Sequence, residues 1–191
     1  AFGLLSAQFI RDKVVPELDA FRFASYCGIS GVTKKEETLA DGAATVAALS
    51  AAVTAMDDEE VTATGRYLFI TPTLLQGIND MDTTKSKKVL EGFEQVIKVP
   101  QRRFYTAIKQ LSGKTGEEAG GYTKAAGAAN INFAIVQKDA LIQYTKHAAP
   151  KIIAPENNPD ADAYVFGYRM VGIAKAYKNM LSGMYFSHDK A

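Results

Sequence analysis

Three neighbouring residues near the C-terminus have the side-chain types of a hydrolase triad. Ser187, His188 and Asp189 follow one another directly in the sequence. A triad needs these groups aligned as nucleophile, base and orienting acid, whereas consecutive residues of an extended chain point to opposite faces. We therefore interpret this run as a solvated C-terminal tail rather than a catalytic site.

Gly113, Lys114 and Thr115 have the residue types that end a phosphate-binding loop. The complete motif also needs a glycine five residues before Gly113, so that backbone N–H groups can surround the phosphates. That position is Ile108, and no buried strand clearly precedes the run. The sequence favours a flexible loop over a nucleotide site.

Cys27 and His147 are the residue types of a nucleophilic dyad. Cys27 follows Phe21, Phe23 and Tyr26, and a thiol in such an aromatic cluster is usually a small core residue. His147 lies at the end of an expected strand, where an exposed or hydrogen-bonded histidine is common. Because Cys27 is the only cysteine, the chain has no intrachain disulfide.

Two Asp-x-Asp pairs, Asp80/Asp82 and Asp160/Asp162, offer carboxylates to a hard cation. Neither has the glycine and terminal glutamate of a calcium loop. We expect Asp160 and Asp162 to shape the start of the strand that follows them.

Arg102 and Arg103 precede Phe104 and Tyr105, which combines basic and aromatic character. Because the whole chain is nearly neutral, this run favours an intersubunit contact or a stacking arginine over nucleic-acid readout. Taken together, the motifs predict no catalytic, cofactor or metal site, and no enzymatic activity.

Composition is that of an ordinary globular protein of one or two domains. The 191 residues are 47% hydrophobic and 23% charged, and 22 basic and 21 acidic residues give a formal charge of +1. This balance argues against tight nucleic-acid binding by phosphate neutralisation, although a local basic patch is compatible with it. No apolar run reaches the roughly 20 residues of a membrane helix. No signal peptide is visible, so we expect a soluble intracellular product.

Helical periodicity marks two segments. Apolar residues at helical spacing predict a helix over 2–26, in which Pro16 either kinks one long helix or begins a second. A loose capping box at Thr38–Asp41 and an apolar stripe predict a second helix that ends near Asp57–Glu60. The stripe consists of Leu39, Ala43, Val46, Leu49, Val53 and Met56.

Shorter patterns predict the remaining central elements. Tyr67–Ile70 is a wholly apolar run typical of a buried central strand. We also expect a short helix from 71 to 78, a polar loop over 80–88, a strand over 93–99, an ambiguous segment over 104–111 and an exposed loop over 113–129.

The stretch from Asn130 to Tyr185 predicts an elongated platform. Ile131, Phe133 and Ile135 alternate as in a half-buried strand. Further alternation on either side of residues 147–159, which contain three prolines, predicts two long strands joined by a stiff, extended turn.

Four stretches resemble, in the same order, parts of major capsid proteins of tailed double-stranded-DNA bacteriophages. They are Val14–Phe23, Gly65–Pro72, Val99–Thr106 and Thr145–Arg169. Each motif describes packing and turns rather than chemistry, and the four together span nearly the whole chain. The sequence begins at Ala1 without Met, and the N-terminal arm and extended loop of that family are not recognisable in it.

The resemblance implies an α+β fold of the Hong Kong 97 type. It implies a peripheral-type domain with a spine helix and long strands (1–38 and 146–191) and an axial-type domain with a central sheet (39–145). The implied function is a structural, non-enzymatic subunit of an icosahedral phage head. Its pentamers and hexamers would enclose DNA without sequence-specific binding, with possible scaffold, portal and decoration partners.

The implied location is the virion, after assembly in the host cytoplasm, without membrane or cofactor. Two alternatives stay open. One is an encapsulin-like nanocompartment shell protein, which shares the fold. The other is a small α+β enzyme or ligand-binding domain with a site near the loop over 113–129.

Overall fold

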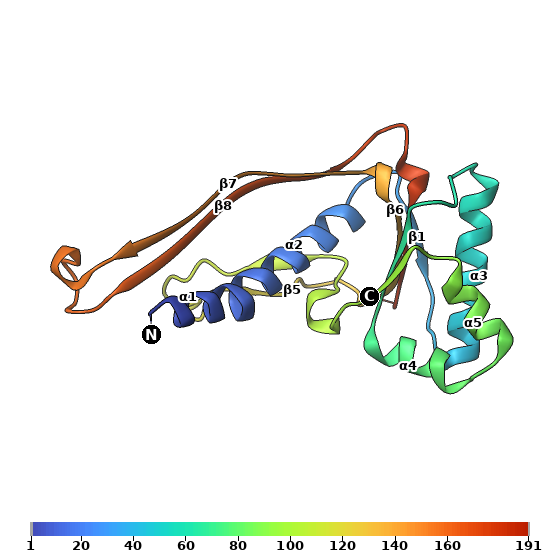
Figure 1. Cartoon of the computed structure of the whole chain (residues 1–191), viewed down its shortest axis with the longest axis horizontal. Helices are drawn as coiled ribbons and strands as arrows, with labels where there is room; N and C mark the ends of the chain where they lie inside the picture. The colour runs from blue at the N-terminus through green and yellow to red at the C-terminus, as the bar shows by residue number, and fades with distance from the viewer. Residues whose placement is uncertain (1, 191) are drawn as a thin grey trace.

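The computed structural model describes residues 2–190 and shows a sheet domain from which a long helix and a two-stranded ribbon extend (Figure 1). The helices are α1 (Phe2–Phe9), α2 (Val15–Cys27), α3 (Gly42–Asp58), α4 (Pro72–Asp80) and α5 (Thr84–Glu91). The strands are β1 (Thr33–Glu36), β2 (Arg66–Ile70), β3 (Gln95–Lys98), β4 (Ile108–Gln110), β5 (Tyr122–Lys124), β6 (Ile131–Gln137), β7 (Leu141–Ile153), β8 (Val165–Ala176) and β9 (Met184–His188).

A five-stranded sheet forms the centre of the domain, in the order β1-β9-β6-β2-β3. The middle strand, β6, is antiparallel to both β9 and β2, while the outer strands β1 and β3 run parallel to their neighbours. The strand predicted at Tyr67–Ile70 is β2, beside this middle strand, and its three buried residues alternate with half-buried ones. The mixture of helix and sheet agrees with the expected class.

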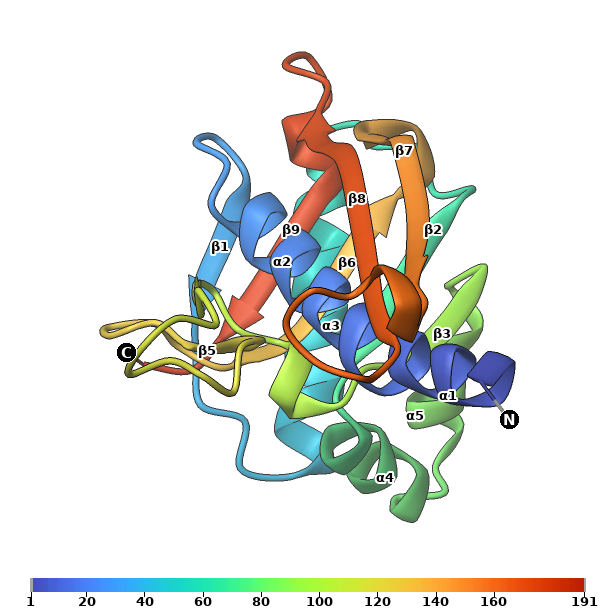
Figure 2. The same ribbon diagram turned by 90° about the vertical axis from the view of Figure 1, so that its left-hand side faces the viewer.

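Both faces of the sheet are covered, which makes a three-layer arrangement (Figure 2). On one face, α3 and α4 pack over Leu68, Phe133 and Ile135. On the other face, the C-terminal end of α2 packs over Ala134 and Phe186. Every residue of β6 is therefore buried. The alternation predicted a half-buried strand, and this prediction is wrong because a second layer covers the other face.

Helix α3 begins where Asp41, rather than Thr38, caps it. The Asp41 carboxylate accepts a hydrogen bond from the backbone N–H of Ala44 at 2.8 Å, which satisfies a free donor of the first turn. Of the predicted apolar stripe, Val46, Leu49 and Met56 are buried in the core. The helix ends at Asp58, within the acidic run that was expected to stop it.

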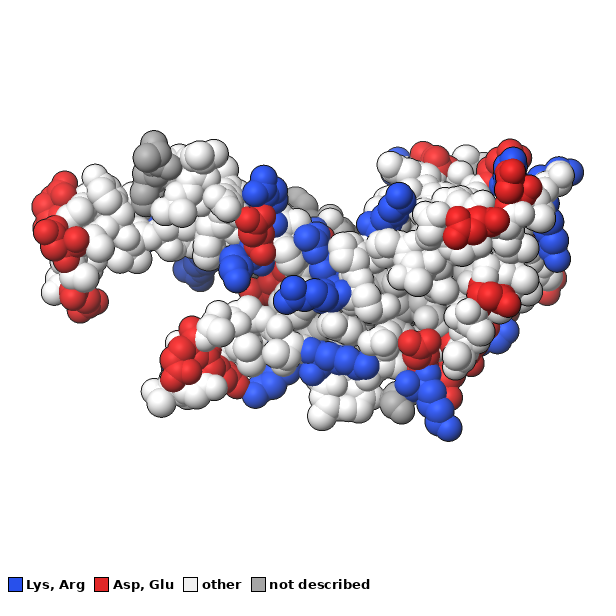
Figure 3. Space-filling model, turned by 90° about the horizontal axis from the view of Figure 1, so that it is seen from below, with Lys and Arg blue, Asp and Glu red and all other residues white. Residues whose placement is uncertain are grey.

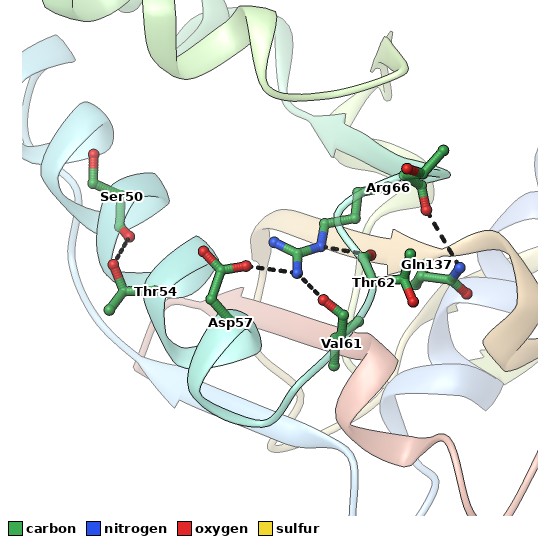
Figure 4. A network of polar contacts seen from close by, with 8 residues as sticks. Ser50, Thr54, Asp57, Val61, Thr62, Arg66 and Gln137 are labelled. Atoms are coloured by element: carbon green, nitrogen blue, oxygen red, sulfur yellow. Dashed lines mark hydrogen bonds and ion pairs between the residues drawn. The ribbon is translucent and has the colours of Figure 1, made fainter.

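A buried arginine joins the end of α3 to β2 (Figure 4). The Arg66 side chain is 2% exposed, and its guanidinium lies 2.7 Å from the Asp57 carboxylate. It also donates to the backbone carbonyls of Thr62, at 3.1 Å, and Val61. These contacts satisfy a charge that would otherwise be costly to bury, and they fix the turn between α3 and β2.

The N-terminal helix is continuous but changes its pitch before Pro16. Residues Ile10–Val14 form a π-helical segment between α1 and α2. Pro16 occupies the first turn of α2, where its missing N–H costs little. Both expectations for Pro16 are thus partly met: one long helix is present, and proline stands near the start of its second half.

The ribbon pairs β7 with β8 over their full lengths, from Leu141↔Ala176 to Ile153↔Val165. This confirms two long strands, but β7 continues through Pro150 and the turn is shorter than predicted. A β-bulge lies between Thr145 and His147. Beside it, Gly172 lies so close to Tyr144 that an added Cβ would be 2.9 Å from its backbone oxygen, so only glycine fits there.

Two predicted loops contain regular structure. Residues 80–88, expected to be a polar loop, include most of α5, whose start is capped by Thr83 and Ser86 in a reciprocal capping box. Residues 113–129 include β5, which pairs with β4 to form a hairpin. The segment 104–111, which was ambiguous, contains β4 rather than a helix.

Candidate interaction surface

A groove of about 550 Å³ lies between the N-terminal helix and the ribbon. Its apolar lining comes from both elements, with Phe9, Leu18 and Phe21 on the helix and Tyr168, Met170 and Ala174 on β8. Leu18 is half-buried and Phe21 is 42% exposed, so the apolar side of this helix is only partly covered. The groove therefore presents partly exposed apolar side chains from both elements.

Contacts at both ends hold the ribbon over the helix. Near the sheet domain, the Tyr26 hydroxyl donates to Gln143 Oε1 at 3.1 Å. At the far end, Phe9 and Phe166 pack edge to face with ring centroids 5.5 Å apart. Because Gln143 and Ala174 are paired across the ribbon, these residues define its helix-facing side.

The second hairpin is tied to the same helix by polar contacts. Arg103 forms an ion pair with Asp19 at 3.1 Å, and Gln110 donates to Glu17 at 3.1 Å. The sequence-predicted Arg102–Arg103 pair therefore has a contact within the chain through Arg103. Arg102 contributes its backbone carbonyl, which accepts from the Tyr122 hydroxyl at 2.8 Å.

The loop of this hairpin is held by a carboxylate. Glu117 accepts from Lys109 Nζ at 2.6 Å and from the backbone N–H of Ser112 at 2.8 Å. These hydrogen bonds, chiefly that from Lys109, lower the pKa of Glu117 to about 2. Gly113, Lys114 and Thr115 lie in this loop between β4 and β5, without the strand-to-helix transition of a phosphate-binding loop.

The Ser187–His188–Asp189 run lies inside the domain rather than in a solvated tail. Ser187 and His188 belong to β9, an interior strand, and Ser187 is fully buried. Asn132 Nδ2 lies 3.4 Å from Ser187 Oγ, and the His188 ring faces the backbone oxygen of Asp189 at 2.7 Å. The tail interpretation is wrong because β9 lies between β1 and β6, and neither of these two contacts joins the Ser187 side chain to the His188 ring.

Cys27 and His147 lie in different parts of the molecule. Cys27 is 2% exposed in the core at the end of α2, and burial raises the pKa of its thiol. His147 is exposed on the ribbon, opposite Val171. The thiol is therefore less available as a thiolate than a free cysteine, as the core interpretation anticipates.

The first Asp-x-Asp pair, Asp80 and Asp82, contacts the side chains of other residues. Asp82 forms an ion pair with Lys87 at 2.6 Å, and Asp80 accepts from Gln76 at 2.6 Å. Asp160 and Asp162 lie in the turn at the far end of the ribbon. Among residues 2–190, no group of three or more His, Cys, Asp or Glu side chains is placed to hold a metal ion.

Sequence reasoning missed Arg66 and the groove. Arg66 immediately precedes the predicted strand Tyr67–Ile70. Only the tertiary structure shows that Asp57, in the acidic run at the end of α3, is its partner. The apolar periodicity over 2–26, to which Leu18 and Phe21 contribute, predicted an apolar helix face but not its partial exposure. No helix within residues 2–190 has the length and apolar character needed to cross a membrane.

Comparison with solved structures defines the class of fold. No family profile matches the sequence, and no curated protein matches it. Similar structures include a chain from Mycobacterium phage Che8, with 9% identity and a TM-score of 0.58. Another is a chain from the capsid structure of the cyanophage P-SCSP1u, with 17% identity and a TM-score of 0.50.

Each comparison covers 91% of the present chain, so the likeness includes the sheet domain and the extended helix and ribbon. The present chain spans 58% and 60% of the length of those two chains. The fold is therefore capsid-like, of the kind found in these phage structures.

Proposed function

We propose that the chain is a major capsid protein of a tailed phage, with a Hong Kong 97-type fold, that assembles into an icosahedral shell around double-stranded DNA. The observation that carries the proposal is the likeness, over 91% of the chain, to a chain from a cyanophage capsid structure. Its role is structural rather than enzymatic. The virion is then its location, after assembly in the host cytoplasm.

The exposed apolar surface supports a role in assembly. A two-stranded ribbon of twelve residues or more has two open edges and is marginal in water by itself. Here it carries large exposed apolar side chains, including Tyr144 and Tyr164, at 62% and 59% exposure. Contacts with other subunits would bury these groups.

The proposed domains follow the resemblance. The peripheral-type part comprises 1–38 and 146–191, and the axial-type part comprises 39–145. A division by sheet would place β1 and β9 with the axial-type part, because both belong to the five-stranded sheet. Pentamers and hexamers, and scaffold, portal or decoration partners, belong to the same proposal. The formal charge of +1 suits a wall that encloses DNA without binding its sequence.

Electron microscopy of the protein expressed alone, with light scattering on the same sample, tests the proposal. Closed shells, tubes or rings of subunits are expected. Phage-like packaging of DNA, rather than an enclosed protein cargo, separates a virion shell from an encapsulin-like compartment. Monodisperse monomers or dimers, even with co-expressed phage assembly proteins, would contradict the proposal and favour a ligand-binding domain that uses the groove.

A further inference from the structure

The two ends of the ribbon carry different sets of exposed side chains. We define the tip cluster as Tyr164 and Val165 with Glu156, Asp160 and Asp162. We define the base cluster as Tyr144, Val171 and Ile173 with Lys146, Lys175 and Lys178. Both clusters contain exposed apolar residues, and the exposed fractions of Val165 and Ile173, which lie on the same face of β8, are 42% and 47%.

The formal charges of the two clusters are opposite. The tip cluster has three carboxylates and no cation, and acidic residues gather at this end of the molecule in Figure 3. The base cluster has three lysines and no carboxylate. Within residues 2–190, none of these six charged groups forms an ion pair. Lys151 and Arg169 lie on the strands between the clusters.

The clusters are matched in chemistry but cannot meet within one chain. Tyr144 and Ile173 are paired near the start of β7, whereas Ile153 and Val165 are paired at its end. At roughly 3.3 Å per residue, the eight residues from Val165 to Ile173 separate the ends by more than about 25 Å. Continuous pairing of β7 with β8 keeps the ribbon extended, so any contact between the clusters joins two molecules.

We propose that the tip cluster of one copy docks on the base cluster of a second copy. This inference rests on the proposed function, since it names one contact through which subunits of a shell associate. Apolar residues would be buried at the centre of the contact, and lysines would face carboxylates around them. The contact uses different surfaces on the two partners, so it is heterologous and can close into a ring.

Charge favours this occupant over others. Contact between two tip clusters would place carboxylates against carboxylates, and contact between two base clusters would oppose lysines. Duplex nucleic acid would attract the base cluster but be repelled by the tip cluster of the same ribbon. A second copy alone uses both clusters.

Cross-linking through one introduced cysteine per chain tests the contact directly. Tyr164→Cys and Ile173→Cys variants of different tag length are mixed and treated with a short bifunctional maleimide. The buried Cys27 is shielded in every sample. The expected result is a mixed dimer at a yield at least about tenfold above that of the exposed control Lys85→Cys mixed with Tyr164→Cys. Equal yields would overturn the proposal.

Charge reversal provides a second measurement. Asp160→Lys with Asp162→Lys, or Lys175→Glu with Lys178→Glu, is expected to lower association at least about tenfold. Combining all four changes in one chain restores opposite charges at the contact and is expected to restore association. These side chains are exposed, so circular dichroism should show an unchanged fold.

The outcomes separate this inference from the proposed function. Shells that form equally well in all variants would refute the contact and leave the shell proposal standing. A specific cross-link in a protein that never forms shells would support the contact and refute the shell. Binding of duplex DNA that is lost on lysine reversal, without a specific cross-link, would overturn the contact in favour of a nucleic-acid surface.

Discussion

The crossing of α3 and α4 depends on two glycines that have different tolerance for a methyl group. A Cβ on Gly42 would overlap the backbone oxygen of Gly77 and lie 2.6 Å from its carbonyl carbon. A Cβ on Gly77 would lie 3.4 Å from the nitrogen and 3.5 Å from the Cα of Gly42, which are ordinary contacts. The same crossing therefore offers a disruptive substitution and its matched control.

Gly42→Ala forces backbone away from backbone, so α3 and α4 must separate over the core. Overpacking of this kind costs about 1–3 kcal/mol of unfolding free energy. Gly77→Ala removes a glycine from the interior of α4, which stabilises a helix by roughly 0.5–1 kcal/mol. The two variants should therefore differ by about 1.5–4 kcal/mol.

Urea unfolding followed by circular dichroism measures this difference for the dissociated protein. A lower midpoint is expected for Gly42→Ala, and an equal or higher midpoint for Gly77→Ala, with similar slopes. The reasoning would be refuted if Gly42→Ala were neutral, or if Gly77→Ala were as destabilising as Gly42→Ala.

Three further predictions concern single groups. Arg66→Met leaves buried carbonyls unpaired and should lower the free energy of unfolding in urea by about 2–5 kcal/mol. Asp57→Asn changes a carboxylate that is 56% exposed and should lower it by less than about 1 kcal/mol. Equal losses in the two variants would contradict the network. Cys27 should react with iodoacetamide near neutral pH only after unfolding, because burial raises its pKa; rapid labelling of the native protein would disprove this. The lowered pKa of Glu117 means that its pairing stabilises the folded loop above its ordinary pKa of 4.5 and is lost as pH falls through about 2. Carboxyl NMR should show this titration, and Lys109→Met should move it upward; an unchanged midpoint would exclude Lys109 as the cause.

Secondary structure was predictable where apolar periodicity and local capping agreed. The stripe through Val46 and Leu49 identified α3, and the run at Tyr67–Ile70 identified β2. The sequence failed for α5, whose three lysines looked like a solvent-exposed loop. Its helix is set by the Thr83–Ser86 capping box and by packing of Val89 and Leu90 against the core, which the polar composition concealed.

The candidate surface was predictable only in outline. Alternation over 142–147 and 164–171 indicated the ribbon, but the burial of Ser187 depended on β1, which pairs with β9 from about 150 residues away. A strand becomes buried on both faces because other elements cover it. The alternation within β6 therefore could not reveal the second layer that covers it.

The sequence by itself determined the long helix, the extended ribbon, the near-neutral charge and the absence of recognisable catalytic motifs, because these depend on composition and short-range spacing. Tertiary structure alone decided which exposed groups form surfaces. Leu18 faces a groove because β8 lies opposite it. The two ends of the ribbon are held apart because β7 and β8 pair along their full lengths, with a single bulge. Contacts between residues distant in sequence fix these features, and local propensity carries no information about them.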